Sequence, residues 1–87
     1  MAYNILWSAP ALDALSAFDV KTKTKVMDKV EFYLADNPLR LSKPLKGFFS
    51  GLYRYRMGKI RIIFALNEKN NTLVVARIGI RKDVYEV

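Results

Sequence analysis

The sequence predicts an α+β domain with the element order β-α-α-β-β-β. In this arrangement an N-terminal strand, an αα-hairpin and a three-stranded antiparallel meander form one sheet with the helices on one face. Apolar residues recur at helical spacing within the first 36 residues, whereas strand-like apolar runs separated by turn formers follow from residue 51 onward. The length of 87 residues suits one small core, so we expect a single domain over residues 1–87.

The N-terminal part divides into a strand and two helices. Residues 3–7 form a short strand, and Ser8 is placed to cap a first helix that follows directly. Asp19 is placed to cap a second helix over residues 20–35. The apolar stripe of that helix comprises Val26, Val30, Tyr33 and Leu34. The helix ends at Asn37, because a residue that precedes proline is disfavoured in the helical region.

The remainder is predicted to be a loop followed by three strands. Residues 38–50 are a basic loop, and the strands cover about 51–57, 60–66 and 72–80. The middle strand is apolar at nearly every position except Arg61, which predicts a central place in the sheet.

The first hairpin can be registered from the sequence. Gly58-Lys59 suits a type II′ turn, because glycine occupies the position that requires positive φ. The expected pairs are Met57 with Ile60, Arg56 with Arg61, Tyr55 with Ile62, Arg54 with Ile63 and Tyr53 with Phe64. Since side chains alternate between faces, Tyr53, Tyr55, Ile62 and Phe64 share the core face, and Arg54, Arg56 and Arg61 share the other. Two arginines directly opposite each other destabilise a sheet, so we interpret the pair as a binding feature for an anion.

The second hairpin has a five-residue connection, which does not fix its register. If Leu66 pairs with Thr72, Arg61 faces Arg77 and Ile62 faces Ala76. Arg77 and Arg81 then lie on the arginine face. Arg77 either joins that site or pairs with Asp83 or Glu86.

Charge is distributed unevenly along the chain. The net charge is +7, with −1 in residues 1–36 (four Lys, five acids) and +8 in residues 37–87 (eleven Lys or Arg, three acids). No acidic residue occurs between Asp36 and Glu68. A one-sided basic half is typical of proteins that bind nucleic acids or acidic proteins, although a solvated basic surface has the same composition.

The residue types present limit the chemistry. The chain has no Cys and no His, which excludes disulfides, thiol nucleophiles and the usual neutral-pH base. No phosphate-binding glycine loop or metal-ligand spacing occurs, and we expect no cofactor or metal. The clustered arginines, with Lys43 and Lys46 near them, suit a phosphodiester. RNA carries its own nucleophile, the 2′-OH, and Tyr85 offers a hydroxyl and a stacking surface.

Several aromatic residues have a simpler interpretation. Tyr53, Tyr55, Trp7 and Phe18 are predicted to belong to the core. Phe48 and Phe49 in the basic loop either cover the sheet or dock a partner, and the sequence does not separate these alternatives.

The ordered set of motifs resembles the RelE/ParE toxin superfamily of bacterial toxin–antitoxin systems. The resemblance covers nearly the whole chain and rests on Tyr3-x-Ile5-x-Trp7-x-x-x-Ala11-x-x-x-Leu15, Asn37-Pro38, Lys43-Pro44-Leu45-Lys46-Gly47, Gly51-Leu52-Tyr53-Arg54-Tyr55-Arg56-x-Gly58, Arg61-Ile62-Ile63-Phe64 and Arg77-Ile78-Gly79-x-Arg81-x-x-Val84-Tyr85. It implies a RelE-like fold and an acidic cognate antitoxin that forms a hetero-oligomer with the toxin.

The resemblance to RelE-type members of this superfamily implies a specific activity. They cleave mRNA on the ribosome without a metal, through 2′-OH attack that leaves a 2′,3′-cyclic phosphate and a 5′-OH end. By position, the resemblance assigns catalytic roles to Arg54, Arg56, Arg61, Arg81 and Tyr85. Lys43, Lys46 and Arg77 are the expected RNA-binding residues, and mRNA and ribosomal RNA the expected partners.

Two departures from RelE leave the proton-transfer groups open. The first hairpin strand carries arginines where RelE members often have lysines, and arginine is not deprotonated in proteins. Ile80 stands where some relatives have histidine. Tyr85 is the first candidate for the general base and Lys46 the second. The alternative functions are a ParE-like inhibitor of DNA gyrase and an inactive nucleic-acid-binding module. The apolar start without a charged n-region or long hydrophobic segment predicts a cytoplasmic protein without membrane association.

Overall fold

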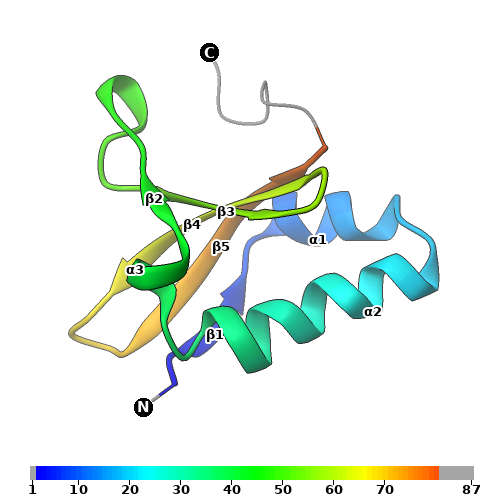
Figure 1. Ribbon diagram of the computed structural model, residues 1–87, viewed down its shortest axis with the longest axis horizontal. Coiled ribbons are helices and arrows are strands. Elements are labelled where there is room, and N and C mark those ends of the chain that lie inside the picture. Colours follow the sequence, from blue (N-terminus) through cyan, green and yellow to red (C-terminus); the bar gives the residue numbers. More distant parts are fainter. Residues whose placement is uncertain (1, 81–87) are drawn as a thin grey trace.

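The computed structural model describes residues 2–80, and its centre is a five-stranded sheet with the order β1-β5-β4-β3-β2. The strands are β1 (Asn4–Trp7), β2 (Lys43–Pro44), β3 (Tyr53–Met57), β4 (Ile60–Asn67) and β5 (Thr72–Gly79). The helices α1 (Ala9–Ser16) and α2 (Val20–Lys29) form a helical layer on one side of this sheet (Figure 1). The predicted meander is confirmed with β4 at the centre, but the sheet is mixed because β1 joins β5 in parallel.

Both predicted helix starts are confirmed. In α1 (Ala9–Ser16) the Ser8 hydroxyl accepts a hydrogen bond from the Ala11 amide at 3.2 Å. In α2 (Val20–Lys29) the Asp19 carboxylate accepts one from the Thr22 amide at 3.3 Å. Hydrogen bonding by Thr22, through its side chain first and its amide second, holds the pKa of Asp19 below its ordinary value. Each cap satisfies an amide that has no partner inside its helix.

The second helix ends in a wide turn that the apolar pattern did not predict. Residues of η1 (Val30–Leu34) form a π turn, in which the Ala35 amide donates to the Val30 carbonyl at 2.9 Å, five residues back. Val30 and Leu34 stay buried, but Tyr33 is 46% exposed. The prediction that Tyr33 belongs to the buried stripe was wrong, because the wider turn rotates its side chain out of the helical repeat.

The segment predicted as a loop over residues 38–50 is largely ordered into short elements. It contains α3 (Pro38–Leu41), the edge strand β2, which pairs with β3, and the 3₁₀ turn η2 (Gly47–Phe49). Pro38 starts α3, where proline is favoured because its missing amide has no helical partner to lose. These elements are too short to produce a periodic signal in the sequence.

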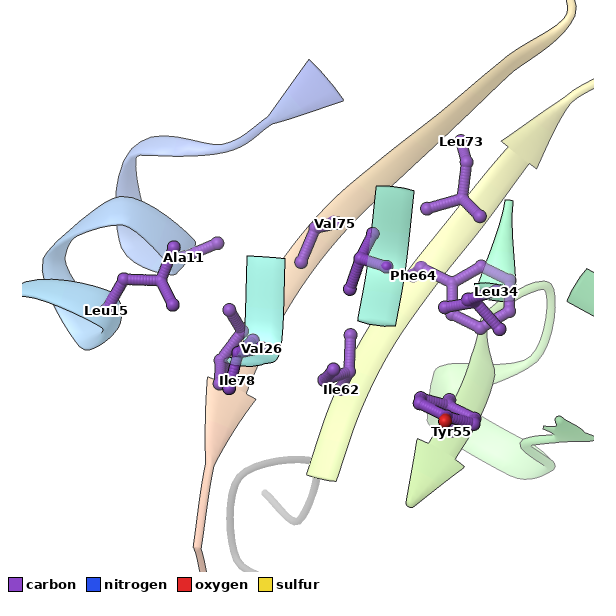
Figure 2. Packing of buried hydrophobic residues seen from close by; sticks show 11 residues of the cluster. Ala11, Leu15, Val26, Leu34, Tyr55, Ile62, Phe64, Leu73, Val75 and Ile78 are labelled. Carbon is purple, nitrogen blue, oxygen red and sulfur yellow. The ribbon is translucent and has the colours of Figure 1, made fainter. Parts of the chain in front are cut away.

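The core lies between the helical layer and one face of the sheet. Figure 2 shows its side chains converging from α1, the α2–η1 helix and strands β3–β5. Leu15, Val26 and Leu34 come from the helices, and Ile62 and Phe64 from β4, all with no exposed surface. Tyr55 is buried, and Tyr53, Trp7 and Phe18 pack against the cluster, as predicted.

The first hairpin register is confirmed at all five predicted pairs. Gly58 has a φ of +61°, and Lys59 is not among the residues with positive φ, a combination that fits the predicted type II′ turn.

The second register was predicted wrongly for two reasons: the turn is one residue shorter than predicted, so that Leu66 pairs with Leu73, and β5 contains a β-bulge. Thr72 pairs with Asn67, and this register continues to the pair of Phe64 with Val75. It then shifts by one residue, so that Ile63 pairs with Arg77. Ala76 is therefore the extra residue on β5. Without it, the alternation that buries Val75 would also direct Arg77 into the core. The bulge reverses the alternation, so that Arg77 is exposed and Ile78 is buried.

Candidate nucleic-acid interface

Two rows of side chains cross the sheet face opposite the core. In the first row, Lys43 lies across from Arg54, Arg54 across from Ile63, and Ile63 across from Arg77. Directly paired residues share a face, so these three basic residues come from β2, β3 and β5 and point the same way. Arg77 thus lies on the predicted face, although its partner is Ile63 and not Arg61.

The second row lies two residues further along the strands. It contains Arg56, Arg61 and Gly79. Strands rise about 3.3 Å per residue, so the two rows are roughly 7 Å apart along the sheet. We call the surface formed by Lys43, Arg54, Arg56, Arg61 and Arg77 the basic face. Opposed guanidinium groups repel each other, and a bound anion between them would relieve this repulsion.

A small cavity opens on the basic face at the edge formed by β2. Its volume is about 160 Å³, and Leu41, Lys43, Arg54 and Arg56 line it. Leu41 was not predicted as part of any site. Its only sequence signal is Pro38, which can start the short helix that carries it. The cavity combines three cationic side chains with one apolar wall.

Arg61 is anchored through its guanidinium group. It is half-buried, and its Nη1 donates to the Ile80 carbonyl at 3.4 Å. Its Nε is buried and makes no hydrogen bond within the part of the chain that the structure describes. A buried donor without a partner is unfavourable, and a guanidinium held in this way keeps its charge near one place on the sheet.

The other predicted site residues lie away from this cluster or outside the structure. Lys46 is exposed, next to η2 and beyond the end of β2. Arg81 and Tyr85 lie outside the described residues. The structure thus brings together five of the eight predicted residues.

A second, apolar groove lies on the helical side of the molecule. It has a volume of about 450 Å³ and is lined by Lys25, Asp28, Lys29, Phe32, Tyr33 and Met57. Phe32 and Tyr33, both in η1, are exposed here, and the Lys29 ammonium lies 4.6 Å from the centre of the Tyr33 ring. Tyr33 also lies near Tyr55, with ring centres 6.4 Å apart. Burial, reinforced by this neighbour, raises the pKa of Tyr55.

Within residues 2–80, no helix has both the length and the apolar character that crossing a bilayer requires.

Comparisons with known proteins place the chain in a family. Residues 5–85 match the model of the ParE toxin of the type II toxin–antitoxin system parDE. The chain is 26% identical over 85 residues to toxin RelG of Mycobacterium tuberculosis, with 98% of each chain covered. It is 27% identical over 85 residues to toxin RelE of the same organism, with 98% of this chain and 88% of the relative covered. The crystal structure of the M. tuberculosis RelBE2 toxin–antitoxin complex contains a chain that superimposes with a TM-score of 0.89 at 24% identity, covering 95% of both chains. The fold, the extent of the family match and these relatives show that the chain belongs to the RelE/ParE family of toxins from type II toxin–antitoxin systems.

Proposed function

We propose that this toxin is a metal-independent endoribonuclease that cleaves mRNA on the ribosome. The observation that carries the proposal is the basic face, where Arg56 lies directly across from Arg61 and Arg54 borders the same cavity as Arg56. A sheet holds such charges at fixed positions, so they are already oriented for a phosphate before it arrives.

The reaction follows from the substrate's own chemistry. The 2′-oxygen attacks the adjacent phosphorus, the bond to the 5′-oxygen breaks, and the products are a 2′,3′-cyclic phosphate and a 5′-OH end. Negative charge increases on the phosphoryl oxygens in the transition state, where guanidinium groups stabilise it. Arginine is not deprotonated in proteins, so another group must remove the 2′-OH proton and protonate the leaving oxygen. Tyr85 or Lys46 is the proposed group for these proton transfers.

The toxin's proposed protein partner is an acidic cognate antitoxin. The RelBE2 relative was crystallised as a complex with its antitoxin. In this chain, the groove bordered by Lys25 and Lys29 with Phe32 exposed suits an acidic segment with apolar side chains. The basic face suits a second acidic segment that would cover the nuclease site.

A primer-extension map of transcripts after induction tests the nuclease proposal. Cuts within translated codons are expected for the native sequence. The double variant Arg56→Ala/Arg61→Ala should give no cuts and no growth arrest. Lys59→Ala is the matched control, because it removes one charge from the exposed turn of the same hairpin and should remain toxic. Full toxicity of the double variant would refute the proposed role of the basic face.

A second candidate function is inhibition of DNA gyrase. The match to the ParE family model favours it. Intact transcripts accompanied by DNA damage after induction would identify this function. The opposed pair of Arg56 and Arg61 favours the nuclease, since a protein that only binds gyrase does not require a phosphate site.

A further inference from the structure

The segment from Leu45 to Leu52, here called the arm, extends beyond the β2–β3 pair as a hydrogen-bonded turn. The Leu45 amide donates to the Leu52 carbonyl at 2.9 Å, and the Leu52 amide donates to the Phe49 carbonyl at 3.1 Å. Gly47 and Gly51 have φ values of +64° and +97°, which other residues rarely adopt. Figure 1 shows the arm (green) projecting from the sheet, well separated from α1 and α2.

The arm holds a phenylalanine in water. Phe48 is 83% exposed, while the ring of Phe49 contacts it edge-on with centres 5.3 Å apart. Of the two alternatives that the sequence left open, covering the sheet is therefore excluded for Phe48. A large apolar ring fixed in solvent is unfavourable unless a partner covers it, because burying such a side chain is strongly favourable. The remaining alternative is a docking role.

The surroundings of the arm indicate what kind of partner would cover Phe48. No acidic residue occurs between Asp36 and Glu68, so every charged side chain on the arm and on β2 and β3 is positive. Lys46 immediately precedes the turn, and the cavity lined by Lys43, Arg54 and Arg56 lies at the base of the arm. Proteins bind single-stranded nucleic acids through exposed rings that stack on bases and cations that pair with phosphates, and the arm carries one side chain of each kind, Phe48 and Lys46.

We propose that Phe48 stacks on an unpaired base of RNA, while Lys46 contacts the phosphates that connect that base to the cavity on the basic face. This subsite rests on the proposed ribonuclease function and extends it, because it adds a nucleotide contact outside the arginine pair. Phe48 would contribute affinity and orientation and would take no part in bond breaking.

Binding to a short 2′-O-methyl oligoadenylate tests the subsite, because such RNA cannot be cleaved and the native chain can be used. Phe48→Ala should weaken binding about tenfold, within the roughly 5- to 150-fold expected from one base–aromatic stack. Phe32→Ala is the matched control, since Phe32 is 76% exposed but lies in the apolar groove of the helical layer. Its affinity for RNA should not change.

A spectroscopic measurement separates stacking from a general effect on the fold. In a Trp7→Phe/Phe48→Trp chain, the only tryptophan lies at the tip of the arm, and stacking on a base should quench its fluorescence. An abasic oligomer with the same number of phosphates should leave the fluorescence unchanged. Equal quenching by both oligomers, or unchanged RNA affinity of Phe48→Ala, would overturn the subsite.

The same variant distinguishes an acidic protein as the partner. If Phe48→Ala binds RNA normally but loses affinity for the antitoxin, the arm is a protein-docking element and the proposal is wrong. Failure of the subsite does not affect the nuclease proposal, which depends on transcript cleavage by the Arg56/Arg61 pair. Conversely, loss of stacking in Phe48→Ala with persistent toxicity of the Arg56→Ala/Arg61→Ala variant would support the subsite and refute the nuclease site.

Discussion

Ser8 links the start of α1 to the bulge that turns Arg77 toward the basic face. Its hydroxyl accepts from the Ala11 amide at 3.2 Å and donates to the Ala76 carbonyl at 2.9 Å, and its own amide donates to the Val75 carbonyl at 3.0 Å. Ala76 is the bulged residue, whose backbone leaves the regular ladder. We therefore expect Ser8→Ala to destabilise both the helix and the bulge.

The magnitude follows from the two lost hydrogen bonds. Loss of an N-cap costs about 1 kcal/mol. The Ala76 carbonyl loses its side-chain donor in a partly buried position, which adds about 1 kcal/mol, the lower end of the range for an unsatisfied buried group. The total of about 2 kcal/mol corresponds to a decrease in Tm of roughly 10 °C for a domain of this size.

Thermal unfolding followed by circular dichroism measures this decrease. Ser16→Ala is the matched control, because the Ser16 hydroxyl makes only an exposed local bond to the Asp13 carbonyl, and the Tm should change little. Ser8→Asp keeps the cap acceptor but cannot donate to Ala76, so it should recover about half of the loss. If Ser8→Ala unfolds within about 0.5 kcal/mol of the native chain, the proposed link between cap and bulge is wrong.

Three further substitutions test other parts of the structure. Gly58→Ala should destabilise the hairpin by about 1–2 kcal/mol, because an L-residue is strained at a φ of +61°. Lys59→Ala is the control and should change the free energy of urea unfolding very little. Equal urea midpoints for the two variants would contradict the type II′ turn. The pKa of Tyr55 is raised above its ordinary value of 10.0, so its stabilising contribution is complete below pH 10 and is lost as the pH rises through the folded-state value. Above pH 10, the unfolding free energy of the Tyr55→Phe chain should therefore fall less than that of the native chain. If the two unfolding free energies fall in parallel as the pH rises, burial does not raise the pKa of Tyr55. Phe64→Ala should lower the free energy of unfolding by about 3–5 kcal/mol, because the side chain is fully buried. A value within about 1 kcal/mol of the native one would mean that neighbouring side chains fill the space that Phe64 leaves.

The parts predicted correctly from sequence depend on local chemistry. A two-residue turn with glycine first fixes the hairpin register, and strict alternation then assigns every side chain of β3 to a face. Ser8 and Asp19 as caps follow in the same way from residues close to them in the chain. The opposition of Arg56 and Arg61 was thus determined by the sequence alone.

Other features were decided only by the tertiary structure. The bulge at Ala76 allows Val75 and Ile78 to be buried while Arg77 stays exposed to water. Ser8, which is 68 residues away in the sequence, stabilises this bulge by a hydrogen bond to the Ala76 carbonyl. The edge strand β2, which places Lys43 beside Arg54, is two residues long and exists because β3 offers a free edge. The exposure of Phe48 depends on a turn whose distance from the sheet no local pattern specifies. The sequence by itself determined the arginine pair, since neighbours along the chain position it. The extent of the basic face depended on the tertiary structure, because pairing between residues far apart in the chain places β2 beside β3 and β5 beside β4.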